Sequence, residues 1–439
     1  MTEEARPAVG AALAAVVGET HVWTGERAAA FAVDGLVPRW VAFPGRVEEM
    51  SRCLALATAE GLAVSPTGSG TRLHWGNPPR ALDVVLSLRR LDRILAHEPA
   101  DQTISVEAGA RLLTLNDRLR AYRQCVPLDP ARAEEATVGG LIATGASGPY
   151  RARYGTMREL LLGLTLVQAD GTIVKGGGQV VKNVTGYDMP KLHVGGLGTL
   201  GVVVATHLRL HPVAVEERTW LFGFSSAESL LDAALSIMDA PLVVSRLQLV
   251  NGATLAACGQ VGPTPAGLAV TIGSVSDGVR TQGAQVEAIC SRGGGAALSL
   301  GDSVEWWGRV RKASWPDEPA SGLTLRIGTR PSDVVKALRV IEAVALAGMV
   351  RATAEVANGV LRVALPGRVA SEVPPLVARI REGLAPLGAT CVVEHAPLSA
   401  KATLDVWGEV GPALGLMRGL KAELDPRGVL NPGRFVGGI

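Results

Sequence analysis

The chain has 439 residues, which is too long for one ordinary hydrophobic core and indicates two domains or one domain with a large insertion. A charged fraction of 19% and a net charge of +2 leave no electrostatic footprint for nucleic acid, so we expect no nucleic-acid partner. Residues 1–17 lack the basic start and long apolar core of a signal peptide, and no run of about 18 apolar residues occurs, so we expect a cytoplasmic protein without direct membrane insertion.

The cysteines bear on metal and cluster chemistry. There are five, far apart in the sequence, and no two stand at CxxC spacing: Cys53, Cys125, Cys258, Cys290 and Cys391. Zinc and iron–sulfur sites need closely spaced thiolates, so the sequence predicts reduced, mostly buried thiols and no metal site.

In the first half of the chain, predicted helices and strands are mixed. One or two short helices are expected within 1–35. The patterns then predict strands at 41–43, 62–65, 83–87, 103–109, 160–168, 172–175 and 202–210, and helices at 44–61 and 112–122. The turn Asp170-Gly171 joins two of these strands as a hairpin. This half is predicted to be α+β.

From about residue 215 to 400, strands and helices alternate. Strands are predicted at 219–224, 322–327 and 359–364, and helices at 227–238, 331–347, 371–384 and, later, 412–424. Such alternation indicates a sheet backed by helices.

Two glycine-rich segments could bind a ligand through the backbone. In residues 66–71, alternating glycines follow a buried strand, so consecutive N–H groups can turn toward one phosphate pair, although a plain turn has the same composition. In residues 137–148, glycines stand among small residues, so a flat ring could lie against the backbone. Thr144 and Ser147 could donate hydrogen bonds to such a ring; the alternative is a surface loop.

Two further segments are less specific. Residues 182–192 gather polar, aromatic and charged groups, which also fits a solvated connection. Gly196, Gly198 and Gly201 form a GxGxxG pattern, but it runs into a β-branched strand at Val202. A Rossmann unit needs a helix after this pattern, so we reject that interpretation.

These four segments, in this order, resemble the FAD-binding domain of the vanillyl-alcohol oxidase / p-cresol methylhydroxylase (PCMH) superfamily over residues 37–212. The string 178–192 and Leu197 are similar to the FAD-binding E-type subunit of bacterial glycolate oxidase. The tail 424–435 resembles the C-terminal return segment of the superfamily's lactate and glycolate dehydrogenases.

The resemblance implies an α+β fold with a two-subdomain PCMH-type FAD-binding domain and an α/β cap domain. The implied boundaries are an N-terminal helical segment at 1–35, the FAD domain at 36–213, the cap domain at 214–400, and a C-terminal segment at 401–439 that packs back on the FAD domain. The active site would lie between the two domains, over the flavin ring.

The resemblance also implies which residues bind FAD. Pro66, Gly68, Ser69, Gly70 and Thr71 would form the diphosphate loop; Thr137, Gly139, Gly140, Thr144, Ser147 and Gly148 would lie beside the ribityl chain and isoalloxazine; and Gly198, Gly201 and Val203 would hold the adenine end. Many relatives have Asn where this chain has Gly145. His74 is the nearby candidate for covalent attachment, but it is interpreted as a loop histidine, so non-covalent FAD is predicted.

The catalytic equipment looks incomplete. Related catalytic subunits carry a metal-binding HxGDGxxH motif, but between 350 and 410 this chain has only His395. His193, His207 and His211 are interpreted as structural, so no catalytic base is assigned. The side chains that could bind a substrate carboxylate, or else be surface charges, are Arg326, Arg362, Arg434 and Lys401.

The favoured hypothesis is therefore an FAD-binding subunit of a complex that oxidises glycolate, a small 2-hydroxy acid, to glyoxylate. Its partners would be a second FAD-binding subunit and an iron–sulfur subunit, through which the protein could attach peripherally to the inner membrane. The alternatives are a stand-alone FAD-linked D-2-hydroxy-acid dehydrogenase of the lactate type and a non-catalytic flavin-binding scaffold.

Overall fold

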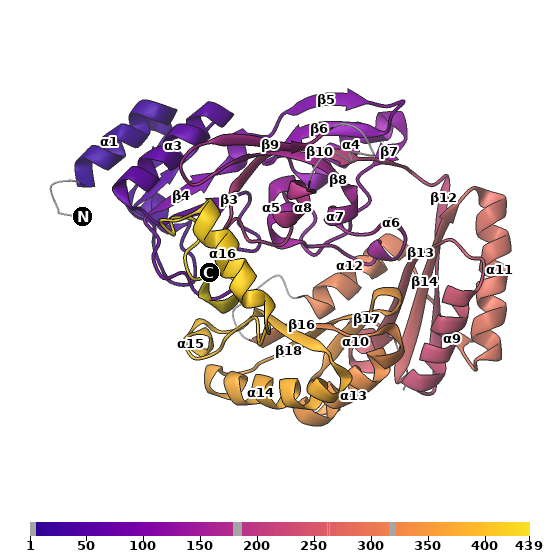
Figure 1. Ribbon diagram of the computed structural model, residues 1–439. Helices are drawn as coiled ribbons and strands as arrows, with labels where there is room; N and C mark the ends of the chain where they lie inside the picture. Colours follow the sequence, from indigo (N-terminus) through magenta and orange to yellow (C-terminus); the bar gives the residue numbers. More distant parts are fainter. Residues whose placement is uncertain (1–5, 179–186, 261, 263, 316–321) are drawn as a thin grey trace. The chain divides into compact units, whose positions relative to one another are not determined.

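The computed structural model describes residues 6–178, 187–260, 262, 264–315 and 322–439. The chain divides into two compact units (Figure 1). Unit 1 comprises 1–147, 156–213 and 409–439, and unit 2 comprises 148–155 and 214–408. Both mix helices and sheets, which confirms the predicted α+β class. Most of the polar string at 178–186 lies outside the described residues. Within the described part, no helix is both long and apolar enough to cross a membrane.

Unit 1 contains two main sheets and a short third one. The four-stranded sheet has the order β1 (Val22–Trp23), β2 (Trp40–Ala42), β4 (Val84–Ser87), β3 (Val64–Thr67). The five-stranded antiparallel sheet has the order β5 (Ile94–Glu98), β6 (Thr103–Glu107), β10 (Val202–Arg209), β8 (Leu161–Val167), β9 (Ile173–Gly177). The strands β7 (Gln124–Cys125) and β11 (His211–Pro212) pair with each other. The predicted hairpin is confirmed, since β8 and β9 are antiparallel neighbours.

The helices of unit 1 are α1 (Arg6–Val17), α2 (Gly25–Ala29), α3 (Val47–Glu60), α4 (Leu112–Leu119), α5 (Val138–Thr144), α7 (Met157–Leu160), α8 (Met189–Leu192) and α16 (Ala413–Leu424). Figure 1 shows α1 and α3 side by side. Helix α3 buries Met50, Cys53, Leu54 and Ala57, one face at helical spacing, and it ends at Gly61 in the left-handed conformation. Helix α5 was not predicted, because its glycines disfavour a helix by propensity.

Unit 2 is built on one antiparallel sheet of eight strands. Their order is β15 (Ala296–Ala297), β12 (Glu216–Phe224), β14 (Ala266–Ser274), β13 (Val244–Asn251), β17 (Arg351–Glu355), β18 (Val360–Pro366), β16 (Gly322–Gly328), β19 (Thr390–His395). The helices are α6 (Arg151–Tyr154), α9 (Ala227–Asp239), α10 (Gly252–Ala257), α11 (Ser276–Arg292), α12 (Ser303–Ser314), α13 (Val334–Ala345), α14 (Val373–Leu384) and α15 (Leu398–Lys401).

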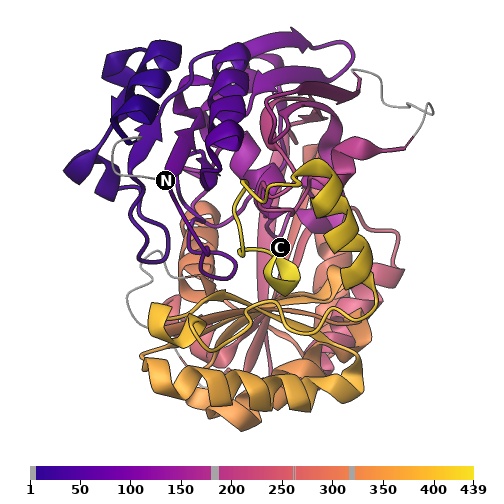
Figure 2. The ribbon, with the colours of Figure 1, turned by 60° about the vertical axis from the view of Figure 1, so that its left-hand side comes forward.

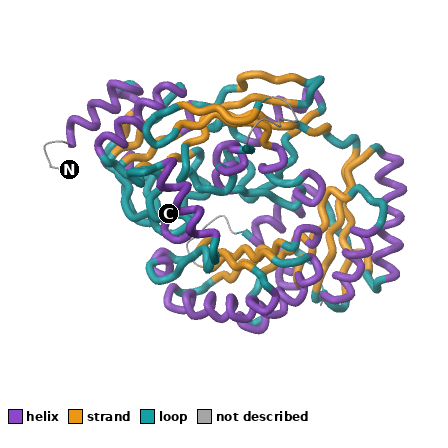
Figure 3. The backbone as a smooth tube through the Cα atoms, in the orientation of Figure 1, coloured by secondary structure: helices purple, strands orange, loops and turns teal. Residues whose placement is uncertain are grey.

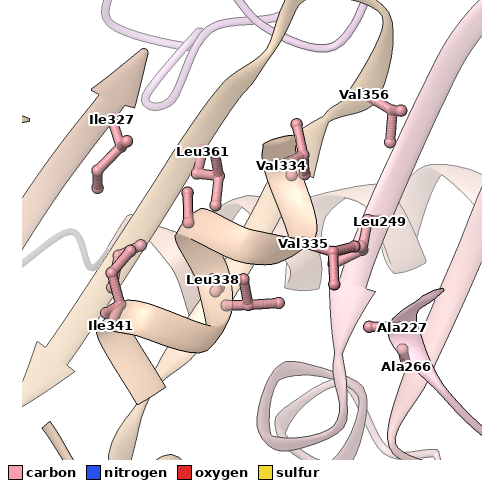
Figure 4. Packing of buried hydrophobic residues seen from close by; sticks show 14 of the residues in the cluster. Ala227, Leu249, Ala266, Ile327, Val334, Val335, Leu338, Ile341, Val356 and Leu361 are labelled. Atoms are coloured by element: carbon pink, nitrogen blue, oxygen red, sulfur yellow. The ribbon is translucent and has the colours of Figure 1, made fainter. Parts of the chain in front are cut away.

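The two faces of this sheet are covered differently. Helices α9, α11, α13 and α14 pack on one face over the main apolar core, and α13 and α14 lie along it in Figure 2. Figure 3 shows these helices in purple beside the orange strands. Figure 4 shows α13 presenting Val335 and Leu338 toward Leu249 and Leu361 of the sheet. Helices α10 and α12 cover part of the other face through a smaller core that contains Trp306 and Trp307.

The sequence analysis assigned no element between 239 and 321, where the structure has two long strands and three helices. Strand β14 is buried along nearly its whole length, so its Ala/Gly/Leu/Val run shows no alternation that would mark a strand. Residues 148–155 cluster with unit 2 because Arg153 Nη1 donates to the Gly273 carbonyl at 2.6 Å.

Candidate functional site

A groove in unit 1 consists of two cavities that adjoin each other. They share Pro66, Thr67, Gly68, Thr137, Gly140 and Ala143, and their empty volumes are about 520 and 470 Å³. The first cavity is also lined by Leu88, Ala108, Gly139, His193, Gly196, Gly198, Leu200, Gly201, Val202 and Val203. The second cavity is also lined by Ser69, Gly70, Thr71, Arg72, Leu73, Thr144, Leu197 and Arg434. An elongated groove of this kind suits a long, jointed ligand better than a compact one.

The structure brings most of the predicted site residues to this groove. All of them line it except Ser147, which is buried elsewhere, and Gly148, which begins the segment that clusters with unit 2. The sequence analysis missed other lining residues: Thr67, Arg72, Leu73, Leu88, Ala108, Ala143, Gly196, Leu200 and Val202. Most of these present small or apolar groups next to the predicted glycines, so only their position in the fold distinguishes them.

Loop 66–71 packs so closely against the start of helix α5 that there is no room for a side chain between them. A Cβ added to Gly68 would overlap the side chain of Thr137. Thr137 is fixed in turn, because its Oγ1 accepts a hydrogen bond from the Gly140 N–H at 3.2 Å as the N-cap of α5. Similarly, a Cβ on Gly139 would lie 2.7 Å from Ala108 Cβ. The walls of the groove are therefore largely backbone.

The glycine segment before β10 closes the other side. Gly198 has φ +68°, and a Cβ there would lie 3.0 Å from Pro66 Cγ. Glycine is therefore required at this position both by the left-handed backbone conformation and by the close approach of Pro66. Gly201 leads directly into strand β10. The rejection of a Rossmann unit is therefore confirmed, since a strand and not a helix follows this pattern.

The hydroxyl groups of the groove differ in what they can offer a ligand. Thr67 is 4% exposed and lines both cavities, and its Oγ1 has no hydrogen-bond partner among the described residues. Leaving such a hydroxyl unpaired costs about 1–3 kcal/mol, and because Thr67 lines both cavities, a ligand in the groove can supply the missing partner. The Thr144 hydroxyl instead donates to the Gly140 carbonyl at 2.7 Å. Because a hydroxyl has one hydrogen to donate, Thr144 can only accept from a ligand in this arrangement, contrary to the expectation that it donates.

His193 lies in the wall of the first cavity, although it was interpreted only as a structural histidine. It is buried, and desolvation lowers its pKa to about 4. The imidazole is therefore neutral at neutral pH. It can contact a ligand without adding charge to the cavity.

The candidate carboxylate-binding residues fall in different places. Arg434 belongs to unit 1 and lines the second cavity, whereas Arg326, Arg362 and Lys401 belong to unit 2. Arg326 and Arg362 stand directly opposite each other on β16 and β18. Like charges at such a pair repel.

Two buried carboxylates compensate this repulsion. Glu394 Oε1 accepts from Arg326 Nε at 2.9 Å, and Glu355 Oε1 lies 3.6 Å from Arg362 Nη2. Glu355 Oε2 is also 3.5 Å from Arg151 Nε. Lys401 is buried and the Arg362 side chain is 14% exposed, whereas the Arg326 side chain is 37% exposed and held by its ion pair with Glu394.

The groove of unit 1 can hold a dinucleotide. Backbone N–H groups and a buried guanidinium suit a diphosphate, and flat glycine-lined walls suit aromatic rings. Residues 38–177 match the family described as FAD binding domain, and residues 214–435 match the family described as FAD linked oxidases, C-terminal domain. The first match contains loop 66–71 and residues 137–144 of the groove, and the second contains one lining residue, Arg434.

Two curated relatives span most of the chain, and a third spans less than half of it. A probable mitochondrial D-lactate dehydrogenase of Danio rerio is 29% identical over 426 residues, which cover 91% of this chain and 84% of that protein. Glycolate oxidase subunit GlcD of Bacillus subtilis is 26% identical over 426 residues, which cover 91% and 89%. D-2-hydroxyglutarate dehydrogenase of Xanthomonas citri is 36% identical over 194 residues, which cover 44% and 41%.

Solved structures share the fold. An alkyldihydroxyacetonephosphate synthase has a TM-score of 0.77 at 15% identity, with 98% of this chain and 86% of that chain covered. The p-cresol methylhydroxylase with bound substrate has a TM-score of 0.76 at 13% identity, with 99% and 97% covered. The PCMH-type fold predicted from the resemblance is therefore confirmed.

Proposed function

We propose that this chain, which belongs to the FAD-linked oxidases, oxidises a small 2-hydroxy acid with FAD held in the groove of unit 1. The main support for this proposal is the groove itself. Its walls are close-packed glycine backbone, against which a flat ring can lie, and Thr67 presents a buried hydroxyl there. Flavin, when bound, supplies the acceptor for the two electrons and hydrogen of an alcohol C–H bond. The protein supplies position and charge.

Each part of the groove receives a part of FAD in this proposal. Loop 66–71, with Arg434 beside it, holds the diphosphate. Residues 137–144 lie along the ribityl chain and ring, and Gly198, Gly201 and Val203 line the adenine end. Ser147 and Gly148, which do not line the groove, receive no part of FAD. The attachment is non-covalent, with His74 as a loop residue, and denaturation in acid should release all flavin into the supernatant.

The substrate class comes from the relatives. D-lactate, glycolate and D-2-hydroxyglutarate all carry a hydroxyl beside a carboxylate, and three relatives are named for these acids. A carboxylate is bound by a cation, and the polar face of the unit 2 sheet carries Arg326 and Arg362. Oxidation of the hydroxyl also needs a base, and no residue of the chain is assigned to that role.

The favoured form is a subunit of a glycolate dehydrogenase complex that produces glyoxylate. The supporting observation is that the candidates Arg326 and Arg362 each already have a carboxylate neighbour. A substrate carboxylate must compete with these neighbours, so catalysis by this chain alone should be slow. A second FAD-binding subunit would share the chemistry. An iron–sulfur subunit would carry electrons onward and could attach the complex peripherally to the inner membrane.

The second candidate is a stand-alone D-2-hydroxy-acid dehydrogenase. The similarity to the Danio rerio D-lactate dehydrogenase over 91% of this chain favours it. Bleaching of the flavin absorbance by glycolate, D-lactate and D-2-hydroxyglutarate separates the two. Rapid bleaching of the isolated chain supports the stand-alone enzyme, and slow bleaching that co-purified partners accelerate supports the complex. A chain that binds FAD and is never bleached, alone or with partners, would refute both and leave a flavin-binding scaffold.

A further inference from the structure

The C-terminal segment 425–439 is built into the walls of the groove. Residues 429–431 run beside β3, since Val64 N–H donates to the Val429 carbonyl at 2.8 Å and Asn431 N–H donates to the Val64 carbonyl at 2.8 Å. Strand β3 leads directly into loop 66–71. The strand that positions the diphosphate loop therefore depends on a segment more than 350 residues away along the chain.

The same segment holds the opposite wall. Asn431 Nδ2 donates to the Leu197 carbonyl at 2.6 Å, and Leu197 precedes the glycine that lies against Pro66. Lys421 Nζ donates to the Thr199 carbonyl at 2.8 Å and forms an ion pair with Asp425 at 2.6 Å. Both bonds fix residues 197–199 relative to the C-terminal segment.

Arg434 connects this segment to the second cavity. Its Nη2 donates to the carbonyls of Leu73 at 2.5 Å and Trp75 at 2.7 Å, and its Nη1 donates to Asn431 Oδ1 at 3.2 Å. The residue is 3% exposed and lines the same cavity as Ser69, Gly70 and Thr71. The guanidinium is therefore held in a fixed place in the wall beside the predicted diphosphate loop.

The positive charge of Arg434 indicates what kind of ligand the second cavity binds. Burial lowers the pKa of Arg434 to about 10, so it remains a cation at neutral pH in a place where a cation is costly. The other residues that line the second cavity near loop 66–71 are neutral apart from Arg72, and the carboxylate of Asp34, which raises the pKa of Arg434, offsets only part of these two positive charges. A buried positive potential beside converging backbone donors favours an anion over a neutral ligand.

We propose that Arg434 is a cofactor-binding residue whose buried charge neutralises the diphosphate of FAD, and that the C-terminal segment is thereby part of the cofactor site. This rests on the proposed placement of FAD in the groove. Arg434 is thus no candidate for the substrate carboxylate. It acts on the cofactor before any substrate is involved.

Two substitutions separate charge from hydrogen bonding. Arg434→Gln keeps an amide that can donate to a neighbouring carbonyl but removes the charge, and Arg434→Lys keeps the charge without the planar fork. Arg427→Gln is the matched control, because Arg427 lies in the same segment and also donates to unit 1 carbonyls, those of Thr58 and Ala59, but is exposed and far from the groove lining. Circular dichroism and thermal unfolding of the flavin-free proteins establish that each variant is folded.

Binding is measured on the full chain after removal of flavin, by titration with FAD, ADP and adenosine. R434Q should bind FAD and ADP about 10- to 100-fold more weakly, while adenosine, which has no phosphate, binds as in the wild type. R434K should recover most of the loss, and R427Q should match the wild type. FAD affinity of R434Q equal to wild type, equal losses for ADP and adenosine, or R434K as weak as R434Q would each overturn the proposal.

The outcome is independent of substrate chemistry. If the variants behave as expected but no 2-hydroxy acid bleaches the flavin of the wild type, Arg434 keeps its role and the proposed oxidation fails. If the wild type is bleached but R434Q binds FAD and ADP normally, the oxidation stands and the role of Arg434 fails.

Discussion

The two units of this protein distribute polarity in opposite ways. The groove of unit 1 is lined by backbone and small side chains, with contacts such as that of Gly68 with Thr137 that leave no room for a Cβ. The polar face of the unit 2 sheet instead carries charged side chains on neighbouring strands, with Arg326 and Arg362 balanced by Glu394 and Glu355. Backbone donors have fixed direction and do not titrate, which suits a ligand of constant charge. Ion-paired side chains can exchange one carboxylate partner for another, which suits a ligand whose charge distribution changes during a reaction.

The largest effect should come from breaking the charge balance of unit 2. Glu355→Gln leaves Arg151 and Arg362 without the carboxylate that both approach, so the free energy of unfolding should fall by about 3 kcal/mol. Urea unfolding measures this, and the flavin content of the folded protein should not change. The control D277A removes the partner of Arg280 in an exposed pair and should cost about 0.5 kcal/mol or less. If E355Q unfolded with the same free energy as the wild type, the Glu355 carboxylate would not be needed to offset the charges of Arg151 and Arg362.

The next effect tests the backbone walls of unit 1. Gly68→Val places a side chain into Thr137, so FAD affinity should fall by about 2 kcal/mol, roughly 30-fold, while unit 2 is unaffected. Fluorescence titration of the flavin-free protein measures the affinity. Gly419→Val is the control, since a Cβ at Gly419 of α16 meets open space. If G68V bound FAD normally, the close approach would have no part in cofactor binding.

A smaller effect concerns His193, a residue of the groove wall whose imidazole titrates in the acid range. Its pKa is lowered to about 4 by desolvation, while an unfolded histidine titrates near 6.5, so the unfolded chain takes up the proton first as pH falls. The stabilisation is complete above about pH 6.5 and is lost toward pH 4, which amounts to about 2 kcal/mol between pH 7 and pH 5. His193→Gln should remove this component from the pH dependence of unfolding. Identical pH dependence in H193Q and the wild type would contradict burial of a neutral imidazole.

The smallest effect isolates one hydrogen bond to the ligand. Thr67→Val removes a hydroxyl that has no partner among the described residues, so the flavin-free protein should be as stable as the wild type or slightly more so. FAD affinity should fall by about 1 kcal/mol, roughly fivefold, if the cofactor completes that hydroxyl. The control is S87A, which removes the buried hydroxyl of the residue paired with Thr67 on β4, a residue that does not itself line the groove. Equal FAD affinity in T67V and S87A would assign Thr67 no contact with the cofactor.

Local signals in the sequence were sufficient for much of the fold. Helix α3, the β8–β9 hairpin, β10, α9 and α14 each carry a periodic pattern with a turn or cap residue at one end. The strands β13, β14 and β17 were missed, since strands buried on both faces show no alternation.

The site was predictable where glycine marks it and not where distant segments meet. Loop 66–71 and Gly198 could be found because only glycine fits such backbone. Thr67 looks like any strand-end threonine, and its importance depends on burial without a partner. Arg434 could not be assigned because its contacts with Leu73 and Trp75 join residues about 360 positions apart, and no local pattern records such a contact.

The position of Arg434 along the chain also orders events during synthesis. Proteins emerge from the ribosome N-terminal end first, so loop 66–71 and β10 can form long before residues 429–434 appear. Until then β3 pairs with β4 alone, without residues 429–431 on its other side, and the second cavity lacks Arg434. A nascent chain should therefore remain colourless in the presence of flavin nucleotide, and acquisition of the cofactor reports that translation has passed residue 434.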